Sequence, residues 1–348
     1  MPVPYGIITI AALCQPFTAR DEQMIQIYGT IGPACASVDT LKAMFAEGMT
    51  GIRLNTSHVS LREAEKQIEM IHTAAAACGI RAELLIDMQG PELRLGKLNT
   101  PVDLTAGSSI SLDTLPVPQE VRTVLTKGME ILLDDGRLLL EMTDDANAVV
   151  ERGGTLKSGK SIAVPGAQIC LPAMTVQDRQ NIRDAGKYGV TGVMQPFVRS
   201  AEDLSAVRQA LHEAGGESIR LLAKIEDLSG VSQLESFFPL ADEIVIARGD
   251  LGNAMPLWEL PRVQKDIESR CRKAGMPFMV VTQMLASMEH SAVPTRAEVS
   301  DIYNAVCDGA SSVMVTGETA VGAYPVEVIR YLARTVQSYS EQVDNGDT

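Results

Sequence analysis

The chain has 348 residues and a formal net charge of −14 at neutral pH, with 45% hydrophobic and 21% charged residues. This length is enough to bury a large core, and the composition is that of an ordinary water-soluble protein. A negative field of this size repels phosphate backbones and anionic headgroups, which argues against nucleic-acid and membrane partners. A phosphate ligand would therefore need local cations or a metal ion.

Six cysteines are spread along the chain without a C-x-x-C pair. In a chain of this length the spacing indicates reduced thiols and a cytoplasmic protein. No apolar run approaches the roughly 20 residues needed to cross a bilayer. Residues 1–23 hold a short apolar patch with no basic residue before it, which is a poor signal peptide, and we interpret them as an N-terminal tail.

Short β-rich runs alternate with segments of helical periodicity, which predicts βα units and a parallel sheet. The predicted strands are Gln26–Gly32, Gly51–Ser57, Ala82–Met88, Gly192–Phe197, Arg220–Glu226, Glu243–Asp250, Pro277–Met284 and Ser311–Glu318. The predicted helices are Ser37–Glu47, Leu61–Ala77, Val176–Lys187, Ala201–Ala214, Val231–Phe238, Pro256–Lys273, Arg296–Cys307 and Pro325–Ser340. Glycines follow most helix ends, as C-terminal caps do. Eight such units predict a (β/α)₈ TIM barrel, an α/β fold whose active site lies at the carboxyl ends of the strands.

One interval, between the third strand and the third helix, breaks this alternation. It holds short alternating runs at Ser108–Leu112, Ile131–Leu133 and Leu138–Met142, with turn signals such as Asp135-Gly136. The pattern predicts a small β-rich domain inserted after strand 3. We therefore divide the chain into a tail (1–23), a barrel (24–88 and 171–342) and an inserted lid (89–170), which would cover the active-site mouth.

Charged residues follow several strands, and parallel strands bring their carboxyl ends to one face. Glu226 and Asp250 end neighbouring strands and fit Mg²⁺, which takes few protein carboxylates and completes its shell with water and substrate oxygens. Lys224 lies two residues before Glu226, on the same side of the strand, and would neutralise a transferring phosphoryl group. The alternative is a Lys–Glu salt bridge at the barrel rim. The Arg248-Gly249-Asp250 sequence on the next strand weighs against that alternative.

An oxygen-rich cluster follows the second and third strands, formed by Asn55, Ser57 and Asp87. It suits a monovalent or weakly bound cation, and a hydrogen-bond network explains the same residues equally well. Arg53, just before this cluster, is a candidate phosphate clamp.

Phosphate binding would have to come from the barrel mouth and the lid, because the chain has neither a Walker A sequence nor a G-x-G-x-x-G motif. Gly249 lets the backbone approach a ligand closely, and the segment Asp250-Leu251-Gly252 can open a short helix whose N–H groups face an anion. The four histidines show no metal-ligand spacing, which argues against a zinc site.

Together these segments resemble the pyruvate kinase family. The matching stretches follow the family order from about Met24 to Arg334: Gly29–Pro33, Arg53–His58, Asp87–Arg94, Leu133–Gly136, Val164–Gly166, Lys224–Glu226, Ala247–Gly252, Thr282–Met284, Pro294–Glu298, Asn304–Val306 and Gly317–Ala320. The resemblance implies a cytoplasmic phosphotransferase of the glycolytic type. It would convert phosphoenolpyruvate and ADP, or another nucleoside diphosphate, to pyruvate and the triphosphate.

The resemblance also implies roles for individual residues. Glu226 and Asp250 would ligate Mg²⁺ or Mn²⁺. Lys224 would stabilise the phosphoryl group in flight, Arg53 would hold the substrate phosphate, and Thr282 would help a water protonate the enolate. Substrate contacts would come from Arg53, Lys224, Gly249, Asp250 and Thr282. Potassium would be held by Asn55, Ser57, Asp87 and the carbonyl of Met88, and the nucleotide would be bound by Arg94, Lys160, Asn55 and His58.

The chain departs from the family pattern in several places. Met88-Gln89 replaces the usual Thr-Lys, and Gln89 removes a cation near the nucleotide. Glu92 matches the potassium-dependent members. The chain stops soon after the eighth helix, so we expect no C-terminal effector domain, and a homodimer through the barrel faces.

Two other functions share these features. A Mg²⁺-dependent lyase or aldolase could use the same pyruvate enolate, and a regulatory homologue could bind ligands without turnover. Lys224, Thr282, Arg94 and Lys160 are all retained, which favours the phosphotransferase.

Overall fold

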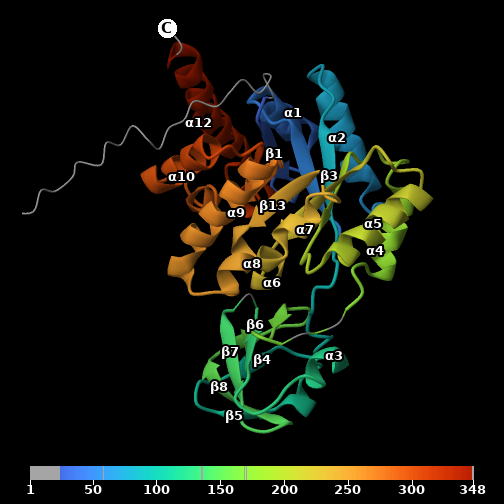
Figure 1. Cartoon of the computed structure of the whole chain (residues 1–348), viewed down its shortest axis with the longest axis vertical. Helices are drawn as coiled ribbons and strands as arrows, with labels where there is room; N and C mark the ends of the chain where they lie inside the picture. The colour runs from blue at the N-terminus through green and yellow to red at the C-terminus, as the bar shows by residue number, and fades with distance from the viewer. Residues whose placement is uncertain (1–23, 58, 135, 168, 170, 347–348) are drawn as a thin grey trace, which may run out of the picture.

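A computed structural model describes residues 24–346 of the protein, apart from positions 58, 135, 168 and 170. It confirms the predicted (β/α)₈ barrel with a β-rich insertion after the third strand (Figure 1). Eight parallel strands close the barrel in the order β1-β15-β14-β13-β12-β11-β3-β2. They are β1 (Gln26–Thr30), β2 (Gly51–Asn55), β3 (Glu83–Asp87), β11 (Gly192–Gln195), β12 (Arg220–Ile225), β13 (Glu243–Ala247), β14 (Phe278–Val281) and β15 (Ser312–Met314).

The strands end earlier than predicted, and the difference matters for the site. After β13 the chain turns at once into a short helix, α8 (Arg248–Asn253), so the predicted strand Glu243–Asp250 is too long. After β14 the backbone leaves the β region, because Thr282 and Gln283 have φ of 75° and 53°. Thr282 and Gln283 therefore lie on a loop beyond the end of β14, where the alternation of side chains along a strand no longer decides which way they point.

The barrel helices follow the strands as predicted, with small shifts. They are α1 (Val38–Ala46), α2 (Glu65–Ala77), α4 (Val176–Asp184), α5 (Ala201–Glu213), α6 (Leu228–Ser232), α7 (Leu234–Phe237), α9 (Leu260–Ala274), α10 (Arg296–Cys307), α11 (Gly317–Ala320) and α12 (Pro325–Gly346). The predicted helix Val231–Phe238 is wrong as a single element, because it is divided between α6 and α7 at Gln233. Five of the glycines predicted to end helices, Gly48, Gly79, Gly215, Gly275 and Gly309, have positive φ and lie at or just after the C-cap of a helix, which confirms them. Gly189 also has positive φ, but α4 already ends at Asp184 with Ala185 as its C-cap. Across the described part of the chain, every helix is too short or too polar to span a lipid bilayer.

Two apolar layers hold the barrel together. The larger lies between the strands and the surrounding helices, and a smaller one fills the barrel interior. Strand alternation decides which residues face inward. In β12, Leu222 belongs to the interior layer, so Lys224 shares its face and Glu226 continues the same row. The interior row thus changes from apolar to charged toward the carboxyl end of the strand.

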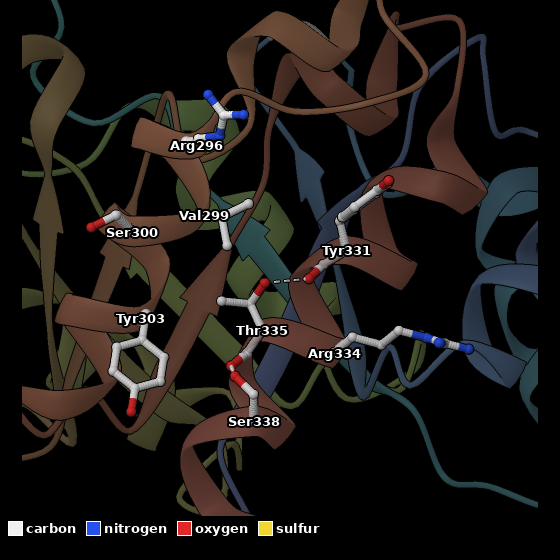
Figure 2. Close-up of a pocket in the computed structure, with 8 residues that line it drawn as sticks. All are labelled: Arg296, Val299, Ser300, Tyr303, Tyr331, Arg334, Thr335 and Ser338. Atoms are coloured by element: carbon white, nitrogen blue, oxygen red, sulfur yellow. Dashed lines mark hydrogen bonds between the residues drawn. The ribbon is translucent and has the colours of Figure 1, made fainter.

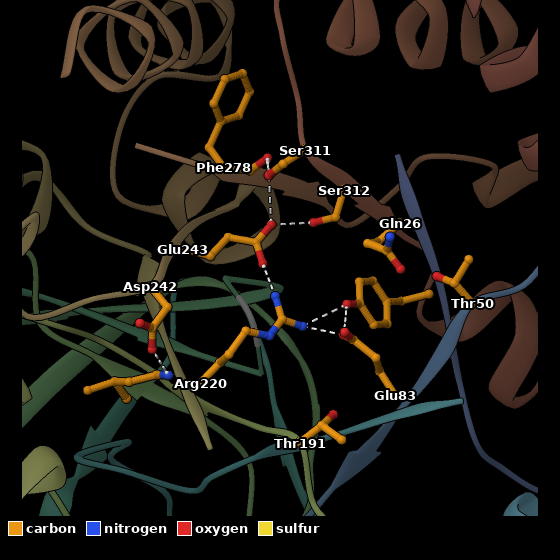
Figure 3. A network of polar contacts seen from close by, with 12 residues as sticks. Gln26, Thr50, Glu83, Thr191, Arg220, Asp242, Glu243, Phe278, Ser311 and Ser312 are labelled. Carbon is orange, nitrogen blue, oxygen red and sulfur yellow. Dashed lines mark hydrogen bonds and ion pairs between the residues drawn. The ribbon is translucent and has the colours of Figure 1, made fainter. Parts of the chain in front are cut away.

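The opposite, amino-terminal end of the barrel is closed by a polar network (Figure 3). The Arg220 guanidinium donates to the Tyr28 hydroxyl at 2.9 Å and to Glu243 at 3.2 Å, and it also pairs with Glu83. Ser312 adds a hydroxyl donor to the Glu243 carboxylate. Burial raises the pKa of Glu243 even though these partners favour its charged form. With this end filled, the open mouth lies at the carboxyl ends of the strands.

The insertion has its own sheets and its own core. Strands β10 (Ile162–Ala163), β6 (Glu130–Leu133), β7 (Leu138–Met142), β8 (Asn147–Arg152) and β5 (Ser109–Ser111) form a five-stranded antiparallel sheet. Strands β4 (Val102–Leu104) and β9 (Gly154–Leu156) pair separately, and the insertion also holds the short helix α3 (Gln119–Arg122). Its buried residues form a cluster apart from the barrel core. Figure 1 shows it on the side of the barrel where α6 and α8 lie.

Candidate active site

Lys224 is the centre of a buried charge cluster at the open end of the barrel. Its Nζ lies 2.9 Å from Glu226 Oε1 and 3.2 Å from both carboxylate oxygens of Asp87. From the neighbouring strand, Arg53 donates through Nε and Nη2 to Asp87 Oδ2 at 2.9 and 2.7 Å. Two cations and two carboxylates from β2, β3 and β12 thus meet at one point, as strand-end convergence predicts.

Burial and pairing set the ionisation of this cluster. Burial opposes the charge on Asp87, but the nearby charges of Lys224 and Arg53 outweigh it and hold the pKa of Asp87 below its ordinary value. Burial likewise disfavours the charged Lys224, yet Asp87 and Glu226 raise its pKa. For Glu226 burial dominates, and the charge of Asp250 adds to it, so its pKa rises to about 7 despite Lys224. Lys224 therefore stays cationic at neutral pH.

The pair Glu226 and Asp250 suits a divalent cation. β12 and β13 are hydrogen-bonded neighbours, so these two carboxylates follow adjacent strands. Their mutual repulsion contributes to the raised pKa of Glu226, and a cation between them would remove that repulsion. Glu226 Oε2 also accepts a hydrogen bond from the Phe197 backbone N–H at 2.7 Å, which fixes the carboxylate. Two carboxylate donors beside an open mouth match the preference of Mg²⁺ for few protein ligands.

Thr282 is held in a strained turn directly after β14. A β-branched residue rarely adopts φ of 75°, and such a conformation costs about 1–3 kcal/mol. Its hydroxyl donates to the Val281 carbonyl and accepts from the Gly249 backbone N–H at 2.8 Å. The Gly249 N–H is therefore occupied by the Thr282 hydroxyl in this structure. The strain indicates that the surrounding contacts, rather than local preference, set the position of the hydroxyl.

The proposed potassium ligands lie at the carboxyl ends of β2 and β3 and in the residues that follow them. Asn55 Oδ1 accepts the Ser57 N–H at 3.0 Å, and the Asp87 carbonyl accepts from both the backbone and the hydroxyl of Thr56. Met88 is buried, and its N–H donates to the Met194 carbonyl. The Asp87 carboxylate is already shared by two cations, Arg53 and Lys224.

The two cationic side chains predicted to bind the nucleotide, Arg94 and Lys160, lie where the insertion joins the barrel. Arg94 pairs with Glu92 at 2.8 Å, and Lys160 pairs with Asp134 at 2.6 Å. The two joining segments run side by side, since the Leu95 N–H donates to the Lys160 carbonyl at 2.7 Å. His58 lies outside the described residues, as do Asp135 of the predicted turn and the tail 1–23.

Asp178 is a site-supporting residue that the sequence analysis missed. Its carboxylate accepts the backbone N–H groups of Gln89 and Gly90, both at 3.0 Å, and so fixes the loop that follows β3. The same carboxylate completes a capping box with Thr175 at the start of α4. The T-x-x-D spacing signals a helix start. Its second role, accepting hydrogen bonds from a loop 88 residues away in the sequence, becomes visible only in the folded structure.

A surface groove between α10 and α12 is separate from this cluster (Figure 2). It is lined by Arg296, Val299, Ser300, Tyr303, Tyr331, Arg334, Thr335 and Ser338. None of these residues belongs to the predicted site, and the two arginines point away from each other.

The fold and the site together are those of a (β/α)₈ barrel with two carboxylates and a buried lysine at its mouth, and comparisons with known proteins identify its family. The family model described as the barrel domain of pyruvate kinase matches residues 22–329. The chain is 37% identical to the pyruvate kinase of Bacillus licheniformis and 35% identical to that of Geobacillus stearothermophilus, over 92% of its own length in each case. A crystal structure of a pyruvate kinase from Cryptosporidium parvum superposes with a TM-score of 0.83 at 33% identity, covering 91% of this chain and 69% of that one.

The chain belongs to the pyruvate kinase family. It spans 57% and 58% of the length of the two bacterial relatives. The matched region includes the barrel strands and the insertion, and so every residue of the charge cluster.

Proposed function

We propose that the chain transfers the phosphoryl group of phosphoenolpyruvate to ADP or another nucleoside diphosphate and releases pyruvate. The observation that carries this proposal is the position of the Lys224 ammonium, which is buried between Asp87 and Glu226 at the barrel mouth. A buried cation among preorganised partners stabilises charge on a transferring phosphoryl group more strongly than an exposed one does.

In this proposal each polar group has one task. Arg53 holds the substrate phosphate with its guanidinium, which Asp87 orients by two hydrogen bonds. Lys224 neutralises the phosphoryl group as it moves. Mg²⁺, or Mn²⁺, would be held by Glu226 and Asp250, and when bound it supplies positive charge to the substrate oxygens. Thr282 delivers a proton, with water, to the methylene carbon of the enolate.

The insertion serves as a lid for the nucleotide in the same proposal. Arg94 and Lys160 lie at the junction of lid and barrel and would exchange their present acidic partners for nucleotide phosphates. Asn55 and His58 would border the same site. Potassium would bind near Asn55, Ser57, Asp87 and the Met88 carbonyl. We place the reaction in the cytoplasm and expect a homodimer through the barrel faces.

A coupled pyruvate-release assay tests the proposal. The purified chain is given phosphoenolpyruvate and Mg²⁺, with and without K⁺, and each of several nucleoside diphosphates in turn. We expect turnover that requires the divalent cation and the diphosphate and rises with K⁺. Pyruvate chemistry that ignores every nucleotide would favour a lyase or aldolase, and ligand binding without any turnover would favour a regulatory role.

A further inference from the structure

Arg248 connects three separate segments behind the site. Its Nη2 and Nε donate to the Thr282 backbone carbonyl at 2.7 and 3.2 Å. Its Nη1 donates to Asp301 Oδ2 on α10 at 2.6 Å. The arginine side chain is only 11% exposed, whereas that of Asp301 is 36% exposed, so the guanidinium is shielded from water and its aspartate partner is partly open to it. Arg248 is the first residue of α8, and its planar guanidinium allows both partners to be bound at once.

These contacts act on the strained residue of the site. The Thr282 carbonyl is bound by Arg248, and the Thr282 hydroxyl is bound by the N–H of the next residue, Gly249. The carbonyl and the hydroxyl of the threonine are thus held by the first two residues of α8. A left-handed threonine persists only where surrounding contacts enforce it, and these are the contacts that do so here.

We propose that Arg248 and Asp301 are positioning residues for proton delivery, which they serve by locking Thr282 in its left-handed turn. Asp301 fixes the guanidinium plane, the guanidinium fixes the Thr282 carbonyl, and the position of the Thr282 hydroxyl is thereby fixed as well. This inference rests on the proposed function, since it assigns the pair to the second half of that reaction. In this proposal neither residue contacts substrate.

The step concerned is the protonation of the pyruvate enolate. The π electron pair of the enolate forms a new C–H bond at the methylene carbon, and the carbonyl re-forms from the enolate oxygen. The O–H bond of the Thr282 hydroxyl or its water breaks, and solvent restores the proton, so one solvent proton is consumed per turnover. A small displacement of the donor slows this step while substrate binding is retained.

The test uses Arg248→Met, Asp301→Asn and a matched control, Arg208→Met. Arg208 on α5 likewise donates to a backbone carbonyl, that of Leu240, at 2.7 Å, and to the carboxylate of Asp242 at 2.6 Å. Both partners lie just before the start of β13, at the end of the barrel opposite the site. Three quantities are measured for each protein: kcat and KM for phosphoenolpyruvate, the solvent deuterium isotope effect on kcat, and exchange of pyruvate methyl protons with D₂O followed by NMR.

We expect Arg248→Met to lower kcat and methyl-proton exchange together by about 100-fold, the cost of displacing a reacting group by about an ångström. KM should change by less than about threefold, because ground-state binding is not involved. The solvent isotope effect should rise, and Asp301→Asn should show the same pattern at about 10-fold, as expected for partial misalignment. Arg208→Met should lose stability only.

An unchanged isotope effect and exchange rate in Arg248→Met, or a loss confined to KM, would overturn the positioning role while wild-type turnover keeps the proposed function. If Arg248→Met does not fold, Asp301→Asn decides by the same readouts. A wild-type chain without turnover or exchange overturns both proposals.

Discussion

Lys224 links two of the three strands that carry the charge cluster, because its ammonium is shared by Asp87 of β3 and Glu226 after β12. Replacing it by methionine removes the cation and keeps the side-chain volume. We expect Lys224→Met to lower kcat by about 10³-fold, as loss of a cation from a transferring phosphoryl group does. Breaking a buried ion pair also costs about 3–5 kcal/mol of stability, so unfolding is measured beside the pyruvate-release rate.

Lys265→Met is the matched control for that variant. Lys265 on α9 also pairs with a buried carboxylate, Glu268 at 3.0 Å, but on the outer face of the barrel. It should lose stability and keep kcat. Wild-type turnover in Lys224→Met would show that the lysine is structural, as the salt-bridge alternative holds.

Gly51 lies at a position where the barrel has no room for a side chain. A Cβ at this position would lie 2.6 Å from the Tyr28 ring and 2.8 Å from the Glu83 carbonyl. Gly51→Ala should therefore destabilise the fold by about 1–3 kcal/mol through overpacking, measured by urea unfolding. Gly186→Ala is the control, since nothing lies within 4 Å of its Cβ and its φ is not positive. Equal stability of the two variants would contradict the packing of Tyr28 against β2.

At the scale of elements, the amino-terminal strand ends share one charge network whose stability depends on pH. Arg220 compensates Glu83 and the buried Glu243. Arg220→Met should lower the free energy of unfolding by about 2–4 kcal/mol at neutral pH. This is at the low end of the loss for a broken buried ion pair, because the arginine side chain is one third exposed.

The sign of the pH dependence follows from the pKa of Glu243, which burial raises in the folded state. Below the unfolded-state pKa of about 4.3 the carboxyl is protonated in both states and costs nothing. As pH rises through the folded pKa, the buried group must ionise, and stability falls. The difference in unfolding free energy between variant and wild type should therefore be smaller at pH 4 than at pH 7.5. A constant difference would show that Glu243 is not coupled to Arg220.

At the scale of the whole molecule, lid and barrel have separate cores joined by two adjacent segments. The Gly159 N–H donates to the Leu95 carbonyl at 3.1 Å, so the junction is already closed like a hairpin. Replacing residues 97–158 by Asn-Gly, a two-residue hairpin turn, should leave the barrel folded. Nucleotide-dependent turnover should fall by at least about 100-fold, because the phosphates lose their positioning. Circular dichroism and the coupled assay measure these outcomes, and loss of cooperative unfolding would show that the barrel needs its lid.

Much of the fold and part of the site follow from local patterns. Period-two alternation places Leu222, Lys224 and Glu226 on one face of β12, and parallel strands bring their ends together. The helix ends at Gly48 and Gly275 follow from the same kind of local rule, since glycine alone adopts positive φ without strain. Local patterns do not predict the position of a residue that is set by contacts with residues distant in the sequence. Asp178 reads as a helix cap, and its hold on Gln89 becomes visible only in the fold.

By itself, then, the sequence determined the barrel, the insertion after its third strand and the row of charges at the mouth. These depend on periodicity and on the order of segments, which the chain carries locally. Only the tertiary structure decided where β13 and β14 end, that Thr282 is held against its backbone preference, and that Arg248 and Asp301 hold it. The physical reason is that strain and buried pairing are set by partners 34 and 53 residues apart, whose contacts no local pattern records.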